Sequence, residues 1–278
     1  MKKTILQTVS GGFDSTYLLI KNLNEGHEVY PIYIHSPTVN QIKQTIELNS
    51  VKQLLERLHS FNNLKGLTET DINLNGIPNL FSSQPIFWLL GLFNEVKNIS
   101  LYSDYDEVHI GYILGDGAVS YLHEIKKLWK ALFSFSLPDY KVPKLVFPLL
   151  KYHKETIIKK LDEYNSEIFD NCWFCETPNI INTKRMKNGN IEMYVESCGE
   201  CSPCIRTRNI ISDNFIKLKK YRAIILINDI YNYLNKTKKT VIRDIKSCNI
   251  PYKYITVENI DEKTIKKLIL TNKDKPSK

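Results

Sequence analysis

The feature that most restricts the fold is a group of five cysteines within 33 residues, spaced C-x2-C-x22-C-x2-C-x2-C. Paired C-x2-C knuckles present thiolates to a tetrahedral ion, and Zn²⁺ is the usual occupant of such sets. A tetrahedral site needs four ligands, so one cysteine is spare, and the spacing leaves open whether Cys172 or Cys175 is used. Nothing in the pattern demands an open coordination position. We therefore predict a structural zinc site on four of the five cysteines, which are Cys172, Cys175, Cys198, Cys201 and Cys204.

A second informative feature is the segment Ser10 to Thr16, which reads S-G-G-F-D-S-T and follows a predicted strand. Paired glycines let the backbone approach phosphates, and the helix that follows offers free N–H groups. The segment lacks the lysine of a G-x4-G-K-[ST] loop and the spacing of G-x-G-x-x-G. Against the alternative of an ordinary strand-to-helix turn, we predict a pyrophosphate-binding loop.

Predicted strands and helices alternate along the first part of the chain, which indicates βαβ units and a mostly parallel sheet. The predicted fold class is α/β, a Rossmann-like parallel sheet with a zinc-binding segment and a C-terminal helical extension. The predicted strands are residues 4–9, 28–35, 106–112 and 145–147, and the predicted helices are residues 14–23, 40–58, 86–96, 120–133 and 153–164.

We expect three parts: a nucleotide-binding domain at 1–170, a zinc-binding segment at 171–215 and a C-terminal extension at 216–278. Within the zinc-binding segment, an Asn188-Gly189 turn signal predicts a hairpin. From Asn209 onward, apolar residues recur at helical spacing, which predicts the helical extension.

The composition is that of a soluble globular protein, with 42% hydrophobic and 24% charged residues. No apolar run approaches the roughly 20 residues that span a bilayer, and the start lacks a signal-peptide pattern, so we expect a cytoplasmic protein without a membrane partner. Reduced thiols in that compartment favour metal over disulfides. The net charge of +8 admits a nucleic-acid partner, but a solvated lysine-rich surface explains it better.

The segment Ser10 to Thr16 resembles the signature loop of the PP-loop (HUP-type) ATP pyrophosphatases. These enzymes cleave ATP to AMP and pyrophosphate while they adenylate a carbonyl or carboxylate oxygen. The resemblance implies ATP and Mg²⁺ as cofactors and a catalytic role for Asp14, which would organise the metal and the triphosphate. The expected ATP-binding residues of the loop are Ser10, Gly11, Gly12, Asp14, Ser15 and Thr16.

This loop together with C-G-x-C-x-x-C near residue 200 resembles the 7-cyano-7-deazaguanine synthases (QueC-like proteins) over about residues 3 to 215. By that resemblance, Gly111 ends the family's V-x-I-G strand and binds the nucleotide, Asp116 binds the substrate base, and Lys154 is a catalytic residue facing the phosphates. Trp173-Phe174-Cys175 resembles the family's W-S-C, which implies Cys172 as the spare cysteine and Zn²⁺ on Cys175, Cys198, Cys201 and Cys204. The implied substrate is 7-carboxy-7-deazaguanine.

Several family segments are missing. The G-Q-x-H run reads His35-Ser36-Pro37-Thr38, the R-N pair reads Ser83-Gln84, the D-C-R run is absent, and Thr156 replaces a family glutamate. We therefore expect that ATP use and the zinc site are retained and that the acceptor side of the site is altered. Related proteins in antiphage operons, including CBASS, are implicated in attaching a deazaguanine to a protein amine. We expect this chain to form such an amide on a protein partner encoded nearby.

Three alternatives stay open. The first is a nitrile synthase that uses ammonia in queuosine or other deazapurine biosynthesis. The second is a PP-loop tRNA-modifying enzyme such as a thiolase, although such enzymes usually carry cysteines near the nucleotide and none precedes Cys172 here. The third is a non-catalytic zinc-ribbon module. A nucleic-acid partner is not expected, and a homodimer is compatible with the sequence.

Overall fold

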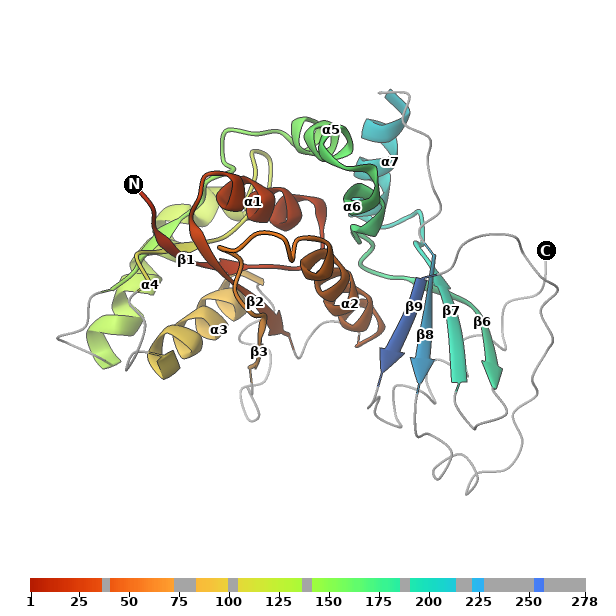
Figure 1. Ribbon diagram of the computed structural model, residues 1–278, viewed down its shortest axis with the longest axis horizontal. Coiled ribbons are helices and arrows are strands. Elements are labelled where there is room, and N and C mark those ends of the chain that lie inside the picture. Colours follow the sequence, from red (N-terminus) through yellow and green to blue (C-terminus); the bar gives the residue numbers. More distant parts are fainter. Residues whose placement is uncertain are drawn as a thin grey trace, which may run out of the picture. The chain divides into compact units, whose positions relative to one another are not determined.

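The computed structural model describes residues 1–36, 41–72, 84–99, 105–136, 142–185, 191–213, 222–227 and 253–257. The chain divides into two compact units (Figure 1). Unit 1 comprises Met1–Val39 and Ser50–Trp173, and unit 2 comprises Asn40–Asn49 and Phe174–Lys278. Helix α2 (Gln41–Arg57) contributes residues to both units.

Unit 1 is built on a five-stranded sheet of order β3-β2-β1-β4-β5, in which every neighbouring pair is parallel. The chain moves from β1 outward through β2 to β3, then returns to β4 on the other side of β1. This reversal creates a switch point between β1 and β4, where open α/β sheets bind ligands at the carboxyl ends of the strands. The strands are β1 (Thr4–Thr8), β2 (Glu28–His35), β3 (Thr68–Asp71), β4 (Glu107–His109) and β5 (Lys144–Val146).

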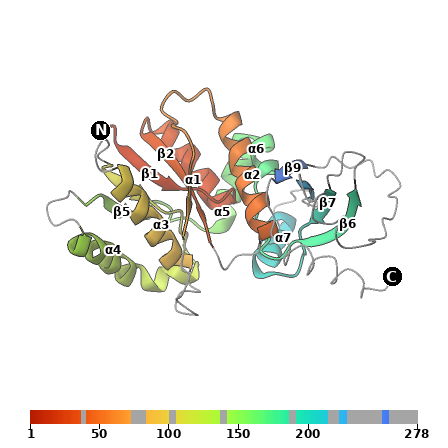
Figure 2. The ribbon, with the colours of Figure 1, turned by 90° about the horizontal axis from the view of Figure 1, so that it is seen from below.

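Helices cover both faces of this sheet, α1 and α5 on one and α3 and α4 on the other (Figures 1 and 2). Helix α3 approaches the sheet so closely that a Cβ atom at Gly91 would lie 2.7 Å from a side-chain carbon of Ile34. The helical elements of unit 1, apart from α2, are α1 (Phe13–Asn24), α3 (Gln84–Ile99), η1 (Gly117–Tyr121), α4 (Leu122–Ser136), α5 (Lys154–Tyr164) and α6 (Ser166–Asn171).

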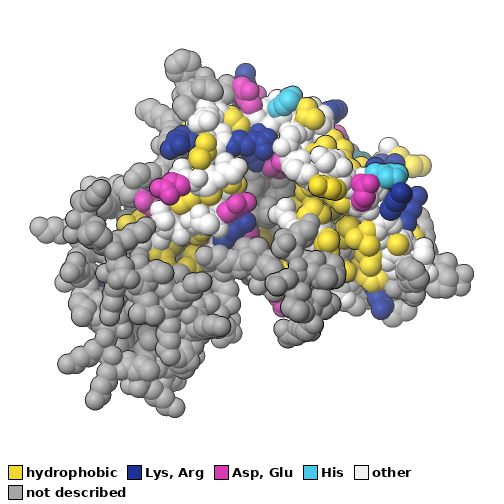
Figure 3. All heavy atoms as spheres, turned by 180° about the vertical axis from the view of Figure 1, so that it is seen from behind, with side chains coloured by type: hydrophobic (Ala, Val, Ile, Leu, Met, Phe, Trp, Pro, Cys, Tyr) yellow, Lys and Arg dark blue, Asp and Glu magenta, His cyan; other side chains and the backbone are white. Residues whose placement is uncertain are grey.

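The two faces of the sheet differ in polarity because alternate strand residues point to opposite sides. On the side of α3 and α4, Leu6 and Val108 are paired in register and belong to an apolar core that also contains Trp129 and Phe133. Hydrophobic side chains also gather at the surface over α3 and α4 (Figure 3). Gln7, one residue after Leu6, is instead paired in register with His109, and both are buried.

Unit 2 contains a four-stranded sheet of order β6-β7-β8-β9. Strands β6 and β7 form the predicted antiparallel hairpin, although its turn at Asn188-Gly189 lies outside the described residues. Strand β8 pairs antiparallel with β7 and parallel with β9. The elements are β6 (Asn179–Arg185), β7 (Ile191–Glu196), α7 (Ser202–Asp213), β8 (Arg222–Ile227) and β9 (Lys253–Val257).

The prediction of a helical C-terminal extension is wrong for the described part of residues 216–278, which consists of strands β8 and β9. Strand β8 reads R-A-I-I-L-I, a short run rich in β-branched residues that pairs well in a sheet. The structural division falls between Trp173 and Phe174 and leaves the hairpin and β8 in one unit. Within the described ranges, no helix combines the length and hydropathy needed to cross a membrane.

Two elements of unit 1 were missed. Strand β3 reads T-E-T-D and carries no apolar alternation, so only its pairing with β2 identifies it. Helix α6 is short, but its start has a local signal, since Asn165 Oδ1 accepts hydrogen bonds from the amides of Glu167 (2.9 Å) and Ile168 (3.1 Å). Asparagine is a favoured residue at this capping position.

Candidate active site and metal centre

The predicted phosphate loop leaves the carboxyl end of β1 and enters α1 at the switch point of the sheet. Gly11 has a φ of 70°, in the left-handed region that favours glycine. Its carbonyl accepts a hydrogen bond of 2.9 Å from the Trp173 amide, which closes the loop from outside. Gly12 precedes the helix with extended backbone, and the N–H groups of the first turn after it have no acceptor within the helix.

Hydroxyl groups brace the loop from within. Ser15 Oγ donates to the Gly12 carbonyl at 3.2 Å and accepts from the Ser10 amide at 3.1 Å. The Ser10 and Ser15 hydroxyls are also within 3.2 Å of each other. Because Ser15 Oγ already donates to Gly12, the Ser10 hydroxyl is the donor of that pair. Thr16 is 1% exposed, so it supports the helix and does not line the loop surface.

A pocket of about 280 Å³ lies over this loop within unit 1. Six of the predicted site residues line it, and Gly111 brings the segment after β4 against the backbone of Asp14 and Ser15. Six further residues line it, of which Tyr112 and Gly117 lie in the segment Gly111 to Gly117 predicted to hold the base. Gln84 and Trp88 on α3 were missed, since only the proline after Gln84 indicated a helix start there. The predicted lining residues are Ser10, Gly12, Asp14, Ser15, Gly111 and Asp116, and the others are Thr8, Gln84, Trp88, Tyr112, Gly117 and Ala118.

Asp14 and Lys154, the two predicted catalytic residues, form an ion pair of 2.6 Å between Lys154 Nζ and Asp14 Oδ2. Both lie in first turns, Asp14 in α1 and Lys154 in α5, and the ammonium also sits 5.5 Å from the centre of the Phe13 ring. The other oxygen, Asp14 Oδ1, is buried and has no hydrogen-bond partner among the described residues. A buried carboxylate oxygen left in this way is suited to a cation or to a donor from a ligand.

Asp116, the predicted base-binding residue, lines the pocket but also holds its own turn together. Its Oδ2 accepts a hydrogen bond of 2.9 Å from the Ile113 amide, and its amide donates to the Ile113 carbonyl at 3.2 Å. Gly115 in this turn has a φ of 92°. The Asp116 side chain therefore stabilises the loop after β4, which reduces what one of its oxygens can offer a ligand.

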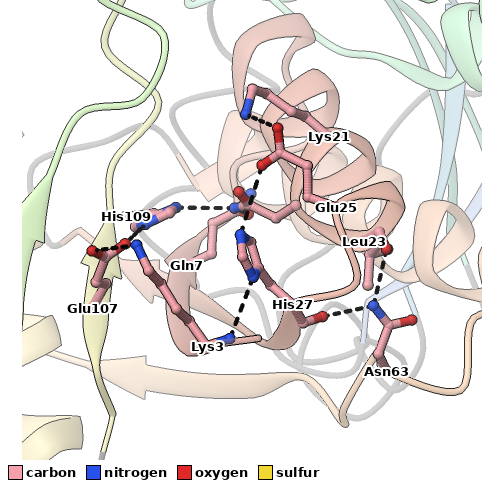
Figure 4. A network of polar contacts seen from close by, with 10 residues as sticks. Lys3, Gln7, Lys21, Leu23, Glu25, His27, Asn63, Glu107 and His109 are labelled. Atoms are coloured by element: carbon pink, nitrogen blue, oxygen red, sulfur yellow. Dashed lines mark hydrogen bonds and ion pairs between the residues drawn. The ribbon is translucent and has the colours of Figure 1, made fainter. Parts of the chain in front are cut away.

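Behind the loop, buried polar side chains from three elements form one network under α1 (Figure 4). Gln7 Nε2 donates to the Ser15 carbonyl at 3.0 Å, and Gln7 Oε1 accepts from Asn22 Nδ2 at 2.8 Å. Asn22 Nδ2 also lies 3.1 Å from His109 Nδ1. His109 Nε2 lies 2.9 Å from one oxygen of Glu107, whose other oxygen accepts from Lys3 at 2.8 Å.

The four predicted zinc ligands lie together, with all their sulfur atoms within 4.8 Å of one another: Cys175, Cys198, Cys201 and Cys204. The Cys198 sulfur is 3.6 Å from that of Cys175 and 3.9 Å from that of Cys204. In a tetrahedral site with bonds of about 2.3 Å, sulfur atoms lie about 3.8 Å apart. The arrangement therefore fits one tetrahedral ion. Cys172 is outside this group, and its thiol donates to the Ile168 carbonyl at 3.5 Å.

The surroundings of the cysteines shift the pKa values of their thiols in different directions. Burial raises the pKa of Cys175 to about 12 and also raises that of Cys204. Burial would raise the pKa of Cys198 as well, but hydrogen bonds from the Thr177 hydroxyl and from the Glu200 and Cys201 amides lower it to about 6. Such donors are typical of knuckles that hold a thiolate, so Cys198 is prepared to bind a cation.

No family model matches the chain. A curated relative, 7-cyano-7-deazaguanine synthase 1 of Desulfitobacterium hafniense (strain Y51), is 29% identical over 104 residues, which is 37% of this chain and 41% of the relative. The chain is thus similar to about two fifths of that enzyme's length. This similarity is to a deazaguanine synthase, which agrees with the resemblance seen in the motifs.

Solved structures with a similar arrangement include a 4-thiouridine synthetase–RNA complex with bound ATP, at 15% identity and a TM-score of 0.41, covering 81% of this chain and 55% of that one. The U34-tRNA thiolase NcsA from Methanococcus maripaludis, with its [4Fe-4S] cluster, matches at 17% identity and a TM-score of 0.36, covering 60% of this chain and 63% of that one. Both TM-scores are low, and the α/β fold class is established by the strand order of unit 1.

Proposed function

We propose that this chain is a PP-loop ATP pyrophosphatase that adenylates a carboxylate and passes the acyl group to an amine. The observation that carries the proposal is the ion pair of Asp14 and Lys154 beside a glycine loop at the sheet's switch point. A carboxylate and an ammonium at the mouth of such a loop can hold a metal and a triphosphate. The similarity to a deazaguanine synthase over 104 residues supports the same chemistry.

In the first step, a carboxylate oxygen of the substrate attacks the α-phosphorus of ATP and the bond to the bridging oxygen breaks. Pyrophosphate leaves and an acyl adenylate remains. The N–H groups of the first turn of α1 face the departing pyrophosphate, and Lys154 adds a positive charge. Mg²⁺ held by Asp14 would neutralise the phosphates during this step.

In the second step, an amine attacks the acyl carbon, AMP leaves, and the amine nitrogen loses a proton to give an amide. The mixed anhydride supplies the driving force because AMP is a far better leaving group than oxide. Trp88 and Tyr112 also line the pocket, and their rings are stacked with 5.5 Å between centroids. A flat aromatic acid suits such a wall.

For the substrate we propose 7-carboxy-7-deazaguanine, with Gly111 and Asp116 on the side of the base. For the acceptor we propose a protein amine, in an antiphage system of the CBASS type. The support is the loss of family segments on the acceptor side, namely G-Q-x-H and D-C-R, while the loop Ser10 to Thr16 is intact. The second candidate, a nitrile synthase using ammonia, is favoured by the similarity to 7-cyano-7-deazaguanine synthase.

For the four-cysteine group we propose a structural Zn²⁺ that joins the segment after Trp173 to the start of α7. All four ligands come from the protein, which leaves no open coordination position for catalysis. The described lining of the pocket contains none of the cysteines that thiolases usually carry near the nucleotide.

The test is mass spectrometry and pyrophosphate release with ATP, Mg²⁺ and 7-carboxy-7-deazaguanine, with either ammonia or a candidate acceptor protein. We expect acid-dependent pyrophosphate and an amide on the acceptor protein. Efficient formation of the nitrile with ammonia alone would establish the second candidate, and no acid-dependent pyrophosphate would contradict both.

Lysine variants provide a matched control for that test. Lys154→Ala removes the ammonium beside Asp14, and we expect the KM for ATP to rise by about 10- to 100-fold, the usual value of one charge-assisted hydrogen bond. Lys151→Ala removes an exposed lysine three residues earlier and should leave the KM unchanged. Equal KM values in the two variants would show that Lys154 does not act on the nucleotide.

A further inference from the structure

The buried network under α1 ends on the phosphate loop, and the proposed reaction does not use it. Its members are nine-tenths or more buried: Gln7 is 0% exposed, Asn22 1%, His109 4% and Glu107 9%. They lie on β1, α1 and β4, so the network ties two strands to the helix that follows the loop (Figure 4). Burying four polar side chains is unfavourable unless every group is satisfied, so their hydrogen-bond directions are restricted.

The direction of each hydrogen bond follows from one backbone carbonyl. The Ser15 carbonyl can only accept, so the Gln7 amide nitrogen faces it and the Gln7 oxygen faces Asn22. The Asn22 amide nitrogen must then donate to that oxygen, and its second hydrogen points to His109 Nδ1. Nδ1 is therefore an acceptor and the imidazole proton is on Nε2, where Glu107 accepts it.

This series of hydrogen bonds cannot accommodate a second proton on His109. Nδ1–H would face the N–H of Asn22. If Asn22 turned over, its oxygen would face the oxygen of Gln7, and if Gln7 turned over as well, its oxygen would face the Ser15 carbonyl. A second proton on His109 thus forces two donors or two acceptors to face each other at one of the contacts between β4 and the loop. The last of these contacts is the one to the Ser15 carbonyl, in the loop itself.

The charged and titratable groups around His109 do not remove this conflict. Burial lowers its pKa, and the contacts with Glu107, which raise it, do not compensate. His27, before β2, and Lys3, before β1, lower it further. The pKa of Glu107 would be raised by burial but is lowered by its hydrogen bonds to Lys3 and His109, so the carboxylate stays charged.

Ser15 transmits the state of the network to the loop because one residue takes part in both. Its carbonyl accepts from Gln7, and its hydroxyl binds the Ser10 amide and the Gly12 carbonyl. We propose that Gln7, Asn22 and His109 are positioning residues for the phosphate loop, and that the loop binds nucleotide tightly only while His109 is neutral. This inference rests on the proposed use of ATP.

The test measures the dissociation constant of MgATP by calorimetry for the wild type, His109→Gln and His109→Phe. Gln offers one acceptor and one donor without titrating, so it should retain the wild-type affinity near neutral pH. Phe fills the space but removes the acceptor of the second Asn22 hydrogen and the donor to one Glu107 oxygen. We expect binding weaker by on the order of tenfold, the usual effect of one unsatisfied buried group.

The second arm repeats the measurement as the pH falls below 6.5, the ordinary pKa of histidine. Protonation of ATP weakens binding equally in the wild type and in His109→Gln. The ratio of their affinities therefore reports only the effect of protonating His109. We expect this ratio to fall with acidification. A constant ratio would overturn the link to His109 protonation, even if His109→Phe failed to fold.

The matched control is Asn63→Ala. Asn63 donates to the Leu23 carbonyl at 3.0 Å and to the His27 carbonyl at 2.6 Å, at the far end of α1 from the loop. Its loss should lower the melting temperature and leave MgATP affinity unchanged. Weaker binding in Asn63→Ala, or wild-type binding in a folded His109→Phe, would make the network purely structural. A wild type that does not bind MgATP would contradict the proposed function as well.

Discussion

Lys154 Nζ lies 2.6 Å from Asp14 Oδ2, although 140 residues separate the two in sequence. The pair connects the first turn of α5 to the first turn of α1, and both side chains are mostly shielded from water, at 14% and 23% exposure. In the structure, the ammonium and the carboxylate neutralise each other. In the proposed function, the phosphates of ATP bind the ammonium and a metal binds the carboxylate.

Asp14→Asn should abolish pyrophosphate release and leave the fold intact. The amide keeps the shape of the side chain but loses the charge that Lys154 and the proposed Mg²⁺ require. We expect turnover to fall by at least about 100-fold, the usual effect of removing one group that stabilises transition-state charge. The measurements are pyrophosphate release and the circular dichroism spectrum. Turnover near the wild-type rate would show that this carboxylate has no role in adenylation.

The paired glycines of the loop should respond differently to alanine. Gly11 has a φ of 70°, so Gly11→Ala should lower the free energy of unfolding by about 1–2 kcal/mol. Gly12 has a φ of −83°, and a Cβ there would lie 3.4 Å from the Trp173 carbonyl oxygen, an ordinary contact. Gly12→Ala should therefore unfold like the wild type in urea. Equal destabilisation of both variants would contradict the loop geometry.

Cys201→Ser should lose both metal and stability, because the binding energy of a structural zinc is also folding energy. Cys172→Ser should be mild, since a serine hydroxyl can replace the thiol as donor to the Ile168 carbonyl. Metal analysis and thermal unfolding of the two purified variants would distinguish them. A full equivalent of zinc in Cys201→Ser would remove this residue from the ligand set.

Glu95→Gln should stabilise the protein at neutral pH. Glu95 lies on α3 and is 7% exposed; burial raises its pKa, and the hydrogen bond with Thr68 only partly opposes this. The folded state therefore holds a proton on Glu95 more tightly than the unfolded state. The resulting stability is present below the unfolded pKa of 4.5 and is lost as pH rises through the folded pKa. Urea denaturation of both proteins at pH 7 and at acid pH tests this: the difference should be largest at pH 7, and a constant difference would refute it.

The sequence alone predicted the parts of this protein that depend on local patterns. The loop Ser10 to Thr16 sits in a strand–turn–helix unit whose apolar periodicity and glycines are local properties. The knuckle Cys198 to Cys204 is likewise a short motif, and its geometry follows from a few consecutive residues. Alternation of strands and helices was enough to predict a parallel sheet, which the pairing of the five strands of unit 1 confirms.

Tertiary structure decided the relationships between distant segments. Pairing with β2 made a strand of Thr68–Asp71, which carries no apolar alternation. Pairing with β7 made a strand of Arg222–Ile227, a run of β-branched residues within the predicted helical extension. Only the packing of α1 on β1 and β4 places Gln7, Asn22 and His109 in one network, because each looks like an isolated polar residue in an apolar segment. Asp116 likewise pairs with the amide of its own turn, a contact that depends on backbone geometry. Side-chain direction in three dimensions determines these contacts, and a linear pattern records only spacing.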